Sequence, residues 1–256
     1  MRKLAIFLAL TVTAMTAAFA QSADTRQPKP KSQKEAEAIN AVFSAQDPDA
    51  RIAAVEALLT KYADTQFKGI ALYVATVSAQ QKNDSEKIIL YGERTLEADP
   101  KGYGAMLIMG QALAARTREF DFDKEEKLGK AEKLAKDALA LVATAPKPNP
   151  AMTDEQWAMA KKDFESQGHE VLGLSAMVRK KYDVAIPELK AAIEAQPQKD
   201  PSTMVRLAVT YNDAGQPDNA IAIVDQLNAM PDLPPSIKQV AAQQKLKAVQ
   251  LKSQKK

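Results

Sequence analysis

Few residues in this sequence have types and spacings that could support catalysis. There is one histidine, His169, and no cysteine, which excludes a cysteine nucleophile and a zinc site built from His and Cys. The sequence contains no glycine-rich phosphate-binding loop, no nucleophile elbow and no helical pair of metal ligands. We therefore expect a protein that is not an enzyme and that carries neither a cofactor nor a catalytic metal.

An acidic segment is the second place where chemistry could occur. Its carboxylates are Asp121, Asp123, Glu125, Glu126 and Glu132. Their spacing superficially matches a calcium-binding loop, in which the first and the twelfth positions are both acidic. However, Glu126 occupies the position where that loop requires glycine, and residues 124–134 have the pattern of a helix. We expect a solvated insertion with an aspartate at the start of a helix; the sequence leaves cation binding by this segment open.

The elements that position these side chains are predicted to be helices. Glycine is scarce, at 9 of 256 residues, alanine is abundant, and long runs lack the alternation of a half-buried strand. Prolines separate the helices, as at Pro48, Pro100 and Pro197, because proline cannot continue the hydrogen-bond ladder of a helix. The sequence therefore favours an all-α chain.

The clearest internal pattern lies in residues 172–197 and recurs once downstream. Its positions are Leu172, Gly173, Ala176, Tyr182, Ala185, Leu189, Ala192 and Pro197. The pattern recurs 35 residues later, carried by Leu207, Ala208, Tyr211, Gly215, Ala220, Val224 and Leu227. It resembles the tetratricopeptide repeat (TPR), a unit of about 34 residues made of two short antiparallel helices. The resemblance is clear over residues 165–232 and weaker back to residue 35.

The resemblance implies a right-handed α-solenoid of about five TPR-like helix hairpins with a capping helix at the C-terminus. The expected hairpins occupy residues 35–64, 65–100, 101–146, 153–197 and 201–231, and the capping helix occupies residues 236–251. The third hairpin contains an insertion at residues 116–129. Together these elements form a repeat domain over residues 35–251. Small residues allow the helices of a hairpin to approach closely, so Ala185→Phe should overpack the fourth one at a cost of about 1–3 kcal/mol.

Three local features refine the expected helices. Thr153 and Gln156 have the spacing of a capping box, in which each side chain satisfies a backbone donor of the other residue. Gly215 suits a tight turn between helices, since glycine accepts a positive φ without steric cost. Pro187 is expected within about the first turn of its helix, where a missing backbone donor costs least.

Both ends of the chain are expected to lie outside the repeat domain. Residues 1–20 have the features of a secretory signal peptide, with Arg2 and Lys3 before an apolar run that ends in small residues. Residues 21–34 are polar and contain two prolines, so we expect a flexible leader, and residues 252–256 form a basic tail. We expect export across the inner membrane into the periplasm, with no stable membrane insertion after cleavage.

The charge balance argues against a nucleic-acid partner. The 35 Lys and Arg residues face 32 Asp and Glu residues, and removal of Arg2 and Lys3 with the signal peptide leaves a formal charge of +1. Binding to nucleic acid depends on a concentration of positive charge that this balance does not supply. No nucleic-acid partner is therefore expected.

The resemblance also implies a function, because TPR proteins act as scaffolds whose first helices line a groove for a peptide or protein segment. By register, the groove residues are Tyr73, Gln80, Gln111, Glu170 and Asn212. His169 stands where the family commonly has a bulky aromatic residue, so we interpret it as a packing residue. Our leading hypothesis is an exported scaffold for a protein or peptide partner in the cell envelope. Two alternatives remain open: an envelope enzyme or small-ligand receptor that uses the insertion at 116–129, and a structural subunit that self-associates into a homo-oligomer.

Overall fold

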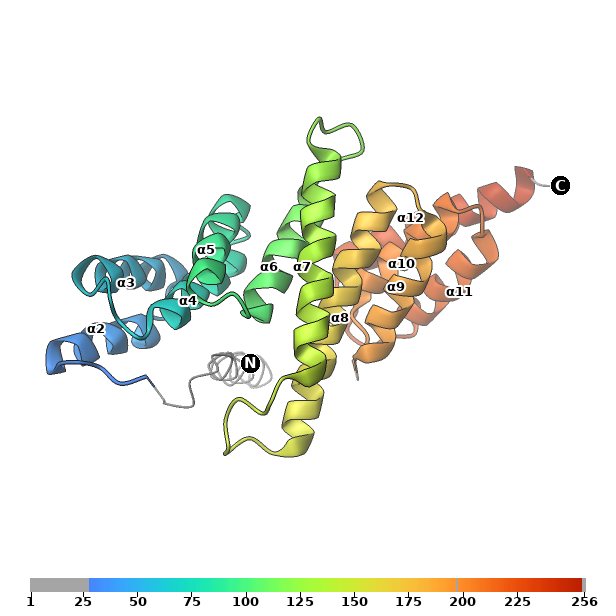
Figure 1. Ribbon diagram of the computed structural model, residues 1–256. Coiled ribbons are helices and arrows are strands. Elements are labelled where there is room, and N and C mark those ends of the chain that lie inside the picture. The colour runs from blue at the N-terminus through green and yellow to red at the C-terminus, as the bar shows by residue number, and fades with distance from the viewer. Residues whose placement is uncertain (1–27, 197, 255–256) are drawn as a thin grey trace. The chain divides into compact units, whose positions relative to one another are not determined.

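The structure is a computed structural model that describes residues 28–196 and 198–254 (Figure 1). All regular secondary structure in these residues is helical, in eleven helices named α2 to α12. From α2 to α5 and again from α9 to α12, each helix packs on its neighbour in sequence, so the expected all-α solenoid class is confirmed. The predicted signal peptide and the first residues of the predicted leader lie outside the described residues.

The helices belong to two compact units. The first unit ends at Leu113 and also includes Lys136–Lys161. The second unit comprises Ala114–Ala135 and the residues from Lys162 onward. The division falls inside three helices, α6 (Tyr103–Arg116), α7 (Lys124–Thr144) and α8 (Asp154–Val178). Each of these three helices therefore contributes residues to both units.

Four helices lie wholly within the first unit: α2 (Gln33–Ser44), α3 (Pro48–Lys61), α4 (Lys68–Gln81) and α5 (Ser85–Ala98). Each packs against the next one, and α2 also contacts α4. Aspartates cap the second helix of each pair. Asp47 accepts hydrogen bonds from two backbone N–H groups at the start of α3, and Asp84 accepts one at the start of α5. Pro48 follows Asp47 at the first helical position, where its missing donor has no intrahelical partner to lose.

An ordered segment precedes α2, in place of the last part of the flexible leader expected there. Ser32 caps α2, which therefore begins two residues earlier than expected. Upstream, the backbone N–H of Lys29 donates to Gln66 Oε1 at 3.1 Å, and Lys31 Nζ donates to the carbonyl oxygen of Asp64 at 3.1 Å. The end of the leader is thus docked on the turn between α3 and α4.

The second unit contains, after the second part of α8, the helices α9 (Tyr182–Ala195), α10 (Pro201–Asp213), α11 (Pro217–Asn228) and α12 (Pro235–Gln254). Each of α9, α10 and α11 packs on the helix that follows it, and α10 also contacts α12. Their apolar core includes Leu189, Leu207 and Val224, all of which are buried. The last helix, α12, corresponds to the predicted capping helix and extends into the segment expected as a basic tail.

Ion pairs link alternate helices at a spacing close to the length of one repeat. They are Glu56 with Arg94 (α3 and α5), Glu170 with Arg206 (α8 and α10) and Asp213 with Lys247 (α10 and α12). The members of these pairs are 38, 36 and 34 residues apart in the sequence. In a stacked array, equivalent helices of neighbouring hairpins face each other. Contacts at this separation therefore indicate a helical repeat.

Helices α8 and α9 approach each other closely, as the small residues in the sequence predict. A Cβ atom on Gly173 would lie 2.8 Å from Leu189 Cγ, which is closer than real Cβ atoms approach other atoms. Ala176 and Ala185 are also buried in this hairpin. Leu189 itself has no exposed surface, so it cannot move away easily.

Two of the three local predictions are confirmed. The N–H of Thr153 donates to Gln156 Oε1 at 2.9 Å and the N–H of Gln156 donates to Thr153 Oγ1 at 3.2 Å, which forms the capping box. Gly215 has a φ of 69°, as the tight turn requires. The third prediction, that Pro187 lies within about the first turn of its helix, was wrong. It is the sixth residue of α9, in the second turn, and the carbonyl of Asp183 therefore lacks a helical donor.

Candidate functional site

Three of the predicted groove residues lie in the first unit and differ in accessibility. Gln80, near the end of α4, is exposed, whereas Gln111 on α6 is half-buried. Tyr73 on α4 packs against α6, since a Cβ atom on Gly104 would lie 2.6 Å from the tyrosine hydroxyl oxygen. Burial, with a smaller effect of Tyr103, raises the pKa of Tyr73 to about 12. Of the three, Gln80 is the residue that a partner can reach most easily.

Glu170, in the second unit, lies in a polar network between α8 and α10. Its carboxylate forms an ion pair with Arg206 and accepts a hydrogen bond from Thr203 Oγ1 at 3.2 Å. Only 12% of its side chain is exposed, and this burial raises the pKa of the Glu170 carboxyl while Arg206 acts in the opposite direction. The sequence reasoning missed Arg206 and Thr203. The repeat length was the signal that could have found them, because they follow Glu170 by 36 and 33 residues.

Asn212, also in the second unit, is covered by the capping helix. Its Nδ2 donates to the carbonyl oxygen of Gln244 at 2.9 Å and to the side-chain Oε1 of the same residue at 3.1 Å. Its Oδ1 is buried without a hydrogen-bond partner. Asn212 therefore holds α12 against α10. Glu170 and Asn212 have separate partners and do not form one cluster.

His169 forms a charged contact across the hairpin of α8 and α9. Its Nδ1 lies 2.7 Å from Glu188 Oε2. The hydrogen bond to Glu188 raises the pKa of His169, against the lowering effect of partial burial. The imidazole therefore joins the two helices through a hydrogen bond, which becomes an ion pair when His169 is protonated, where the sequence pattern suggested a bulky packing group.

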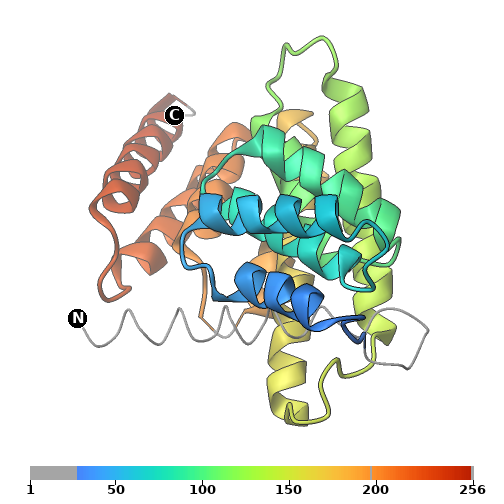
Figure 2. The same cartoon turned by 90° about the vertical axis from the view of Figure 1, so that its left-hand side faces the viewer.

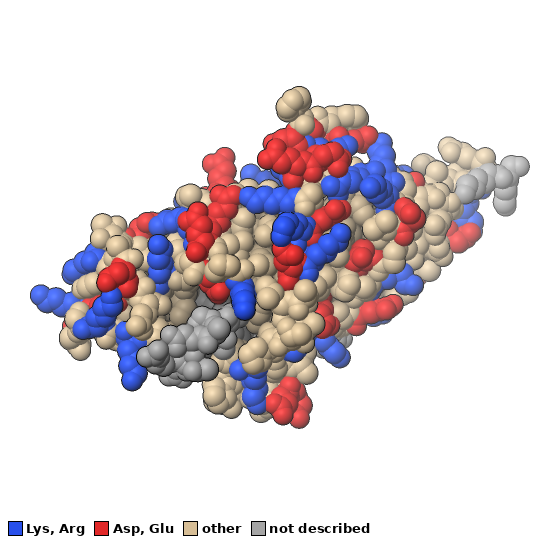
Figure 3. All heavy atoms as spheres, in the orientation of Figure 1, with Lys and Arg blue, Asp and Glu red and all other residues tan. Residues whose placement is uncertain are grey.

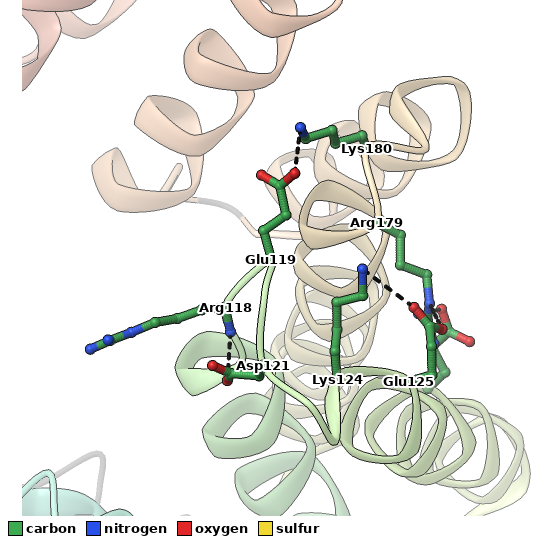
Figure 4. Close-up of polar contacts among 8 residues, drawn as sticks. Arg118, Glu119, Asp121, Lys124, Glu125, Arg179 and Lys180 are labelled. Carbon is green, nitrogen blue, oxygen red and sulfur yellow. Dashed lines mark hydrogen bonds and ion pairs between the residues drawn. The ribbon is translucent and has the colours of Figure 1, made fainter.

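The acidic segment is divided between a loop at residues 117–123, which follows α6, and the start of α7. Four of its carboxylates have basic partners: Glu119 pairs with Lys180, Asp123 pairs with Lys127, and Glu125 and Glu132 both pair with Arg179. Figure 4 shows Glu119 and Glu125 directed at different basic side chains. In the part of the chain that the structure describes, no group of three or more His, Cys, Asp or Glu residues is arranged to hold a metal ion. Of the carboxylates that resembled a calcium loop, Asp123, Glu125 and Glu132 thus form ion pairs.

Arg179 connects the acidic segment to the end of α8. Its Nε donates to Glu125 Oε2 at 2.7 Å and its Nη1 donates to Glu132 Oε1 at 2.6 Å. Only 10% of the arginine side chain is exposed. The next residue, Lys180, has a positive φ of 58° and its Nζ lies 2.6 Å from Glu119 Oε1. The turn between α8 and α9 is therefore bonded to both sides of the loop.

Two phenylalanines in this loop are almost fully exposed. Phe120 and Phe122 expose 90% and 108% of their reference areas, whereas the other exposed large hydrophobic residues of the described chain expose 43–60%. In two perpendicular views the loop projects beyond the first turn of α7 (Figures 1 and 2). We name residues 117–123 the aromatic loop. The sequence reasoning placed a solvated insertion here but overlooked its rings, which the alternation of phenylalanine with acidic residues could have indicated.

Two open hollows lie on the second unit. One, of about 460 Å³, is lined by the start of α11 and by Lys252. The other, of about 320 Å³, is lined mainly by α9, with Tyr211 and the start of α11. Neither hollow is lined by residues of the insertion at 116–129.

Comparison with protein-family models gave no match, and comparison with curated proteins gave no similar sequence. Among the described residues, no helix is both long enough and apolar enough to span a bilayer. The functional interpretation therefore depends on the helical architecture and on the surfaces described above.

Proposed function

We propose that this chain is an exported, non-catalytic TPR-like scaffold that binds a protein or peptide segment in the cell envelope. The observation that supports it most directly is the contact between alternate helices at separations of 34–38 residues. Stacked hairpins of this period create extended concave surfaces, which repeat proteins use for binding. The close approach of Gly173 to Leu189 supports a TPR-like hairpin in the same way.

The accessible polar groups of the predicted groove suit a peptide backbone. Gln80 offers a donor and an acceptor in one exposed side chain. The pair of Glu170 and Arg206 offers an acceptor beside a donor, and about a third of the Arg206 side chain is exposed. Each peptide residue other than proline carries one N–H donor and one carbonyl acceptor. An extended segment of a partner can therefore find both kinds of group at Gln80 in the first unit or at the pair of Glu170 and Arg206 in the second.

Site-specific photo-crosslinking in intact cells tests the groove. Benzoylphenylalanine at Gln80 is expected to form covalent adducts with a protein partner. The matched control is the same substitution at Glu97, which is exposed on α5, the second helix of the same hairpin. Equal adducts at both positions, or none at Gln80, would contradict the proposed groove.

Export is tested by the N-terminus of the protein recovered from cells. Cleavage after Ala20 predicts a mature chain that begins at Gln21 and is released with the periplasmic fraction. Intact mass spectrometry of that fraction distinguishes the mature chain from the full-length one. A full-length chain confined to the cytoplasm would contradict export.

One surface favours self-association as a second candidate function. On α12, Leu246 and Val249 expose 60% and 51% of their reference areas. They are three residues apart and therefore lie on neighbouring positions of one helix face. Light scattering decides between the two functions, because a scaffold is expected to have the mass of a monomer. A dimer that Leu246→Ser dissociates would favour the structural subunit.

A further inference from the structure

The aromatic loop places its two rings in successive tight turns. The N–H of Asp121 donates to the carbonyl of Arg118 at 3.2 Å, and the N–H of Lys124 donates to the carbonyl of Asp121 at 3.1 Å. Phe120 lies inside the first turn and Phe122 inside the second. Single exposed apolar residues are ordinary on protein surfaces, but two almost fully exposed aromatic residues within one short loop are not. Aromatic side chains that enter a partner's pocket are frequent anchors of protein interfaces.

The loop is fixed at both ends, which suits it for binding. Arg179 holds Glu125 at the start of α7, and Lys180 holds Glu119 near the start of the loop (Figure 4). A segment that is already held in place loses less conformational freedom when it binds. The ion pairs therefore favour a loop that presents both rings in advance.

The charges around the rings indicate the chemistry of the partner. Five carboxylates flank the two phenylalanines in sequence. Glu119, Asp123 and Glu125 form ion pairs within the chain, which leaves Asp121 and Glu126 as the acidic groups that a partner can pair with. Figure 3 shows acidic side chains gathered at this end of α7. An anionic lipid surface would repel these groups. A protein pocket bordered by Lys and Arg would attract them and would steer the loop during encounter.

A second copy of this chain fits these charges less well. The exposed apolar residue Leu246 on α12 does have lysines near it in the sequence. Those lysines are already paired within the chain: Lys245 with Asp225, Lys247 with Asp213 and Lys252 with Asp218. The α12 surface therefore does not offer the free basic rim that the aromatic loop requires.

We propose that the aromatic loop is a docking element whose Phe120 and Phe122 enter an apolar pocket with a basic rim on a protein partner. The proposal rests on the proposed scaffold function, but it uses none of the predicted groove residues. It therefore assigns a second contact surface to the binding of the partner.

The first experiment places benzoylphenylalanine at Phe120 or at Phe122 of the full-length, exported protein in intact cells. The control position is Leu90, an exposed large hydrophobic residue on α5 that belongs to none of the proposed surfaces. We expect one protein to be crosslinked at both loop positions and not at the control. Absence of a protein adduct at the loop overturns the proposal. Adducts at Gln80 in the same cells would then still support the proposed groove, so the groove proposal and the aromatic-loop proposal can fail separately.

The second experiment measures binding of the captured partner, purified, to variants of the mature protein. The double variant Phe120→Ser/Phe122→Ser is expected to weaken binding at least about tenfold, which corresponds to about 1.4 kcal/mol. Leu90→Ser removes an exposed leucine side chain from α5 and should leave binding unchanged. Since both phenylalanines are solvent-exposed, the double variant should keep the circular dichroism spectrum and the Tm of the parent. Equal affinities of the double variant and the parent overturn the proposal.

The same proteins test the role of charge and the two alternative binding partners, a lipid membrane and a second copy of this chain. Glu126→Lys should weaken binding at low ionic strength and less so at high ionic strength, whereas Glu97→Lys should not. Vesicles of phosphatidylcholine, with and without phosphatidylglycerol, should not sediment the parent protein. Sedimentation velocity should show a monomer. Vesicle binding or dimerisation that the double phenylalanine variant abolishes would assign the loop to a membrane or to a second copy and overturn the proposal.

Discussion

The contact between α8 and α9 can be tested by adding one methyl group. Gly173 and Gly129 both lie within helices, on α8 and α7, and both belong to the second unit. A Cβ atom on Gly173 would meet Leu189 Cγ and Cδ2 at 2.8 Å, whereas a Cβ atom on Gly129 would have no neighbour within 4 Å. The same substitution, glycine to alanine, therefore adds a methyl group to a crowded contact in one case and to open solvent in the other.

The two substitutions should change stability in opposite directions. Alanine in a helix is favoured over glycine by about 1 kcal/mol, and Gly129→Ala should gain about this amount. Gly173→Ala gains the same helix propensity but forces Leu189, which is fully buried, to shift. Overpacking of this kind costs about 1–3 kcal/mol. The free energy of unfolding of Gly173→Ala should therefore fall by about 1 kcal/mol, and it should differ from that of Gly129→Ala by about 1–3 kcal/mol.

Thermal unfolding followed by circular dichroism measures both variants against the parent. For a protein of this size, a change of 1 kcal/mol shifts Tm by about 2–4 °C, so the opposite shifts are easily resolved. The comparison cancels helix propensity, because both sites are helical. If Gly173→Ala raises stability as much as Gly129→Ala does, the close packing of α8 on α9 is wrong.

Three further predictions follow from single contacts. Glu188 raises the pKa of His169, so the stabilisation from this pair is fully present below the unfolded pKa of about 6.5 and is lost as pH rises through the higher folded pKa. Glu188→Gln should therefore lower the free energy of unfolding more at about pH 6 than at about pH 9. Equal losses at the two pH values would oppose the ion pair. Ala185→Phe should lower stability by about 1–3 kcal/mol because Ala185 has no exposed surface, and an unchanged Tm would contradict this packing. Arg179→Ala should increase hydrogen exchange in the aromatic loop with little change at α11, and unchanged exchange in the loop would show that Arg179 does not hold it.

Sequence reasoning was most successful where local chemistry determines the structure. Thr153 and Gln156 are three residues apart, so their capping box needs only a helix start and no distant partner. Gly215 adopts the positive φ that the short connection of α10 to α11 requires. The small residues at Gly173 and Ala185 were correctly assigned to a helix contact, because a repeat places the partner helix at a short and fixed distance in sequence.

Sequence reasoning was less successful where a side chain's partner depends on the irregular part of the chain. Arg179 reaches Glu132, 47 residues earlier, because the loop and the long α7 alter the regular spacing of contacts. A repeat pattern predicts contacts near one repeat length and so could not identify this pair. The same limit applies to Pro187, whose place in α9 depends on where the preceding turn ends.

The exposed rings at Phe120 and Phe122 show why the candidate docking surface escaped a pattern based on periodicity. Amphipathic spacing identifies residues that face a core, and it carries no information about apolar residues in a loop, which have no helix face. Such a residue is informative only when the structure shows that nothing in the described chain covers it. The repeat pattern therefore accounts for the residues that build the helical array, whereas a departure from the pattern is what presents these two rings to a partner.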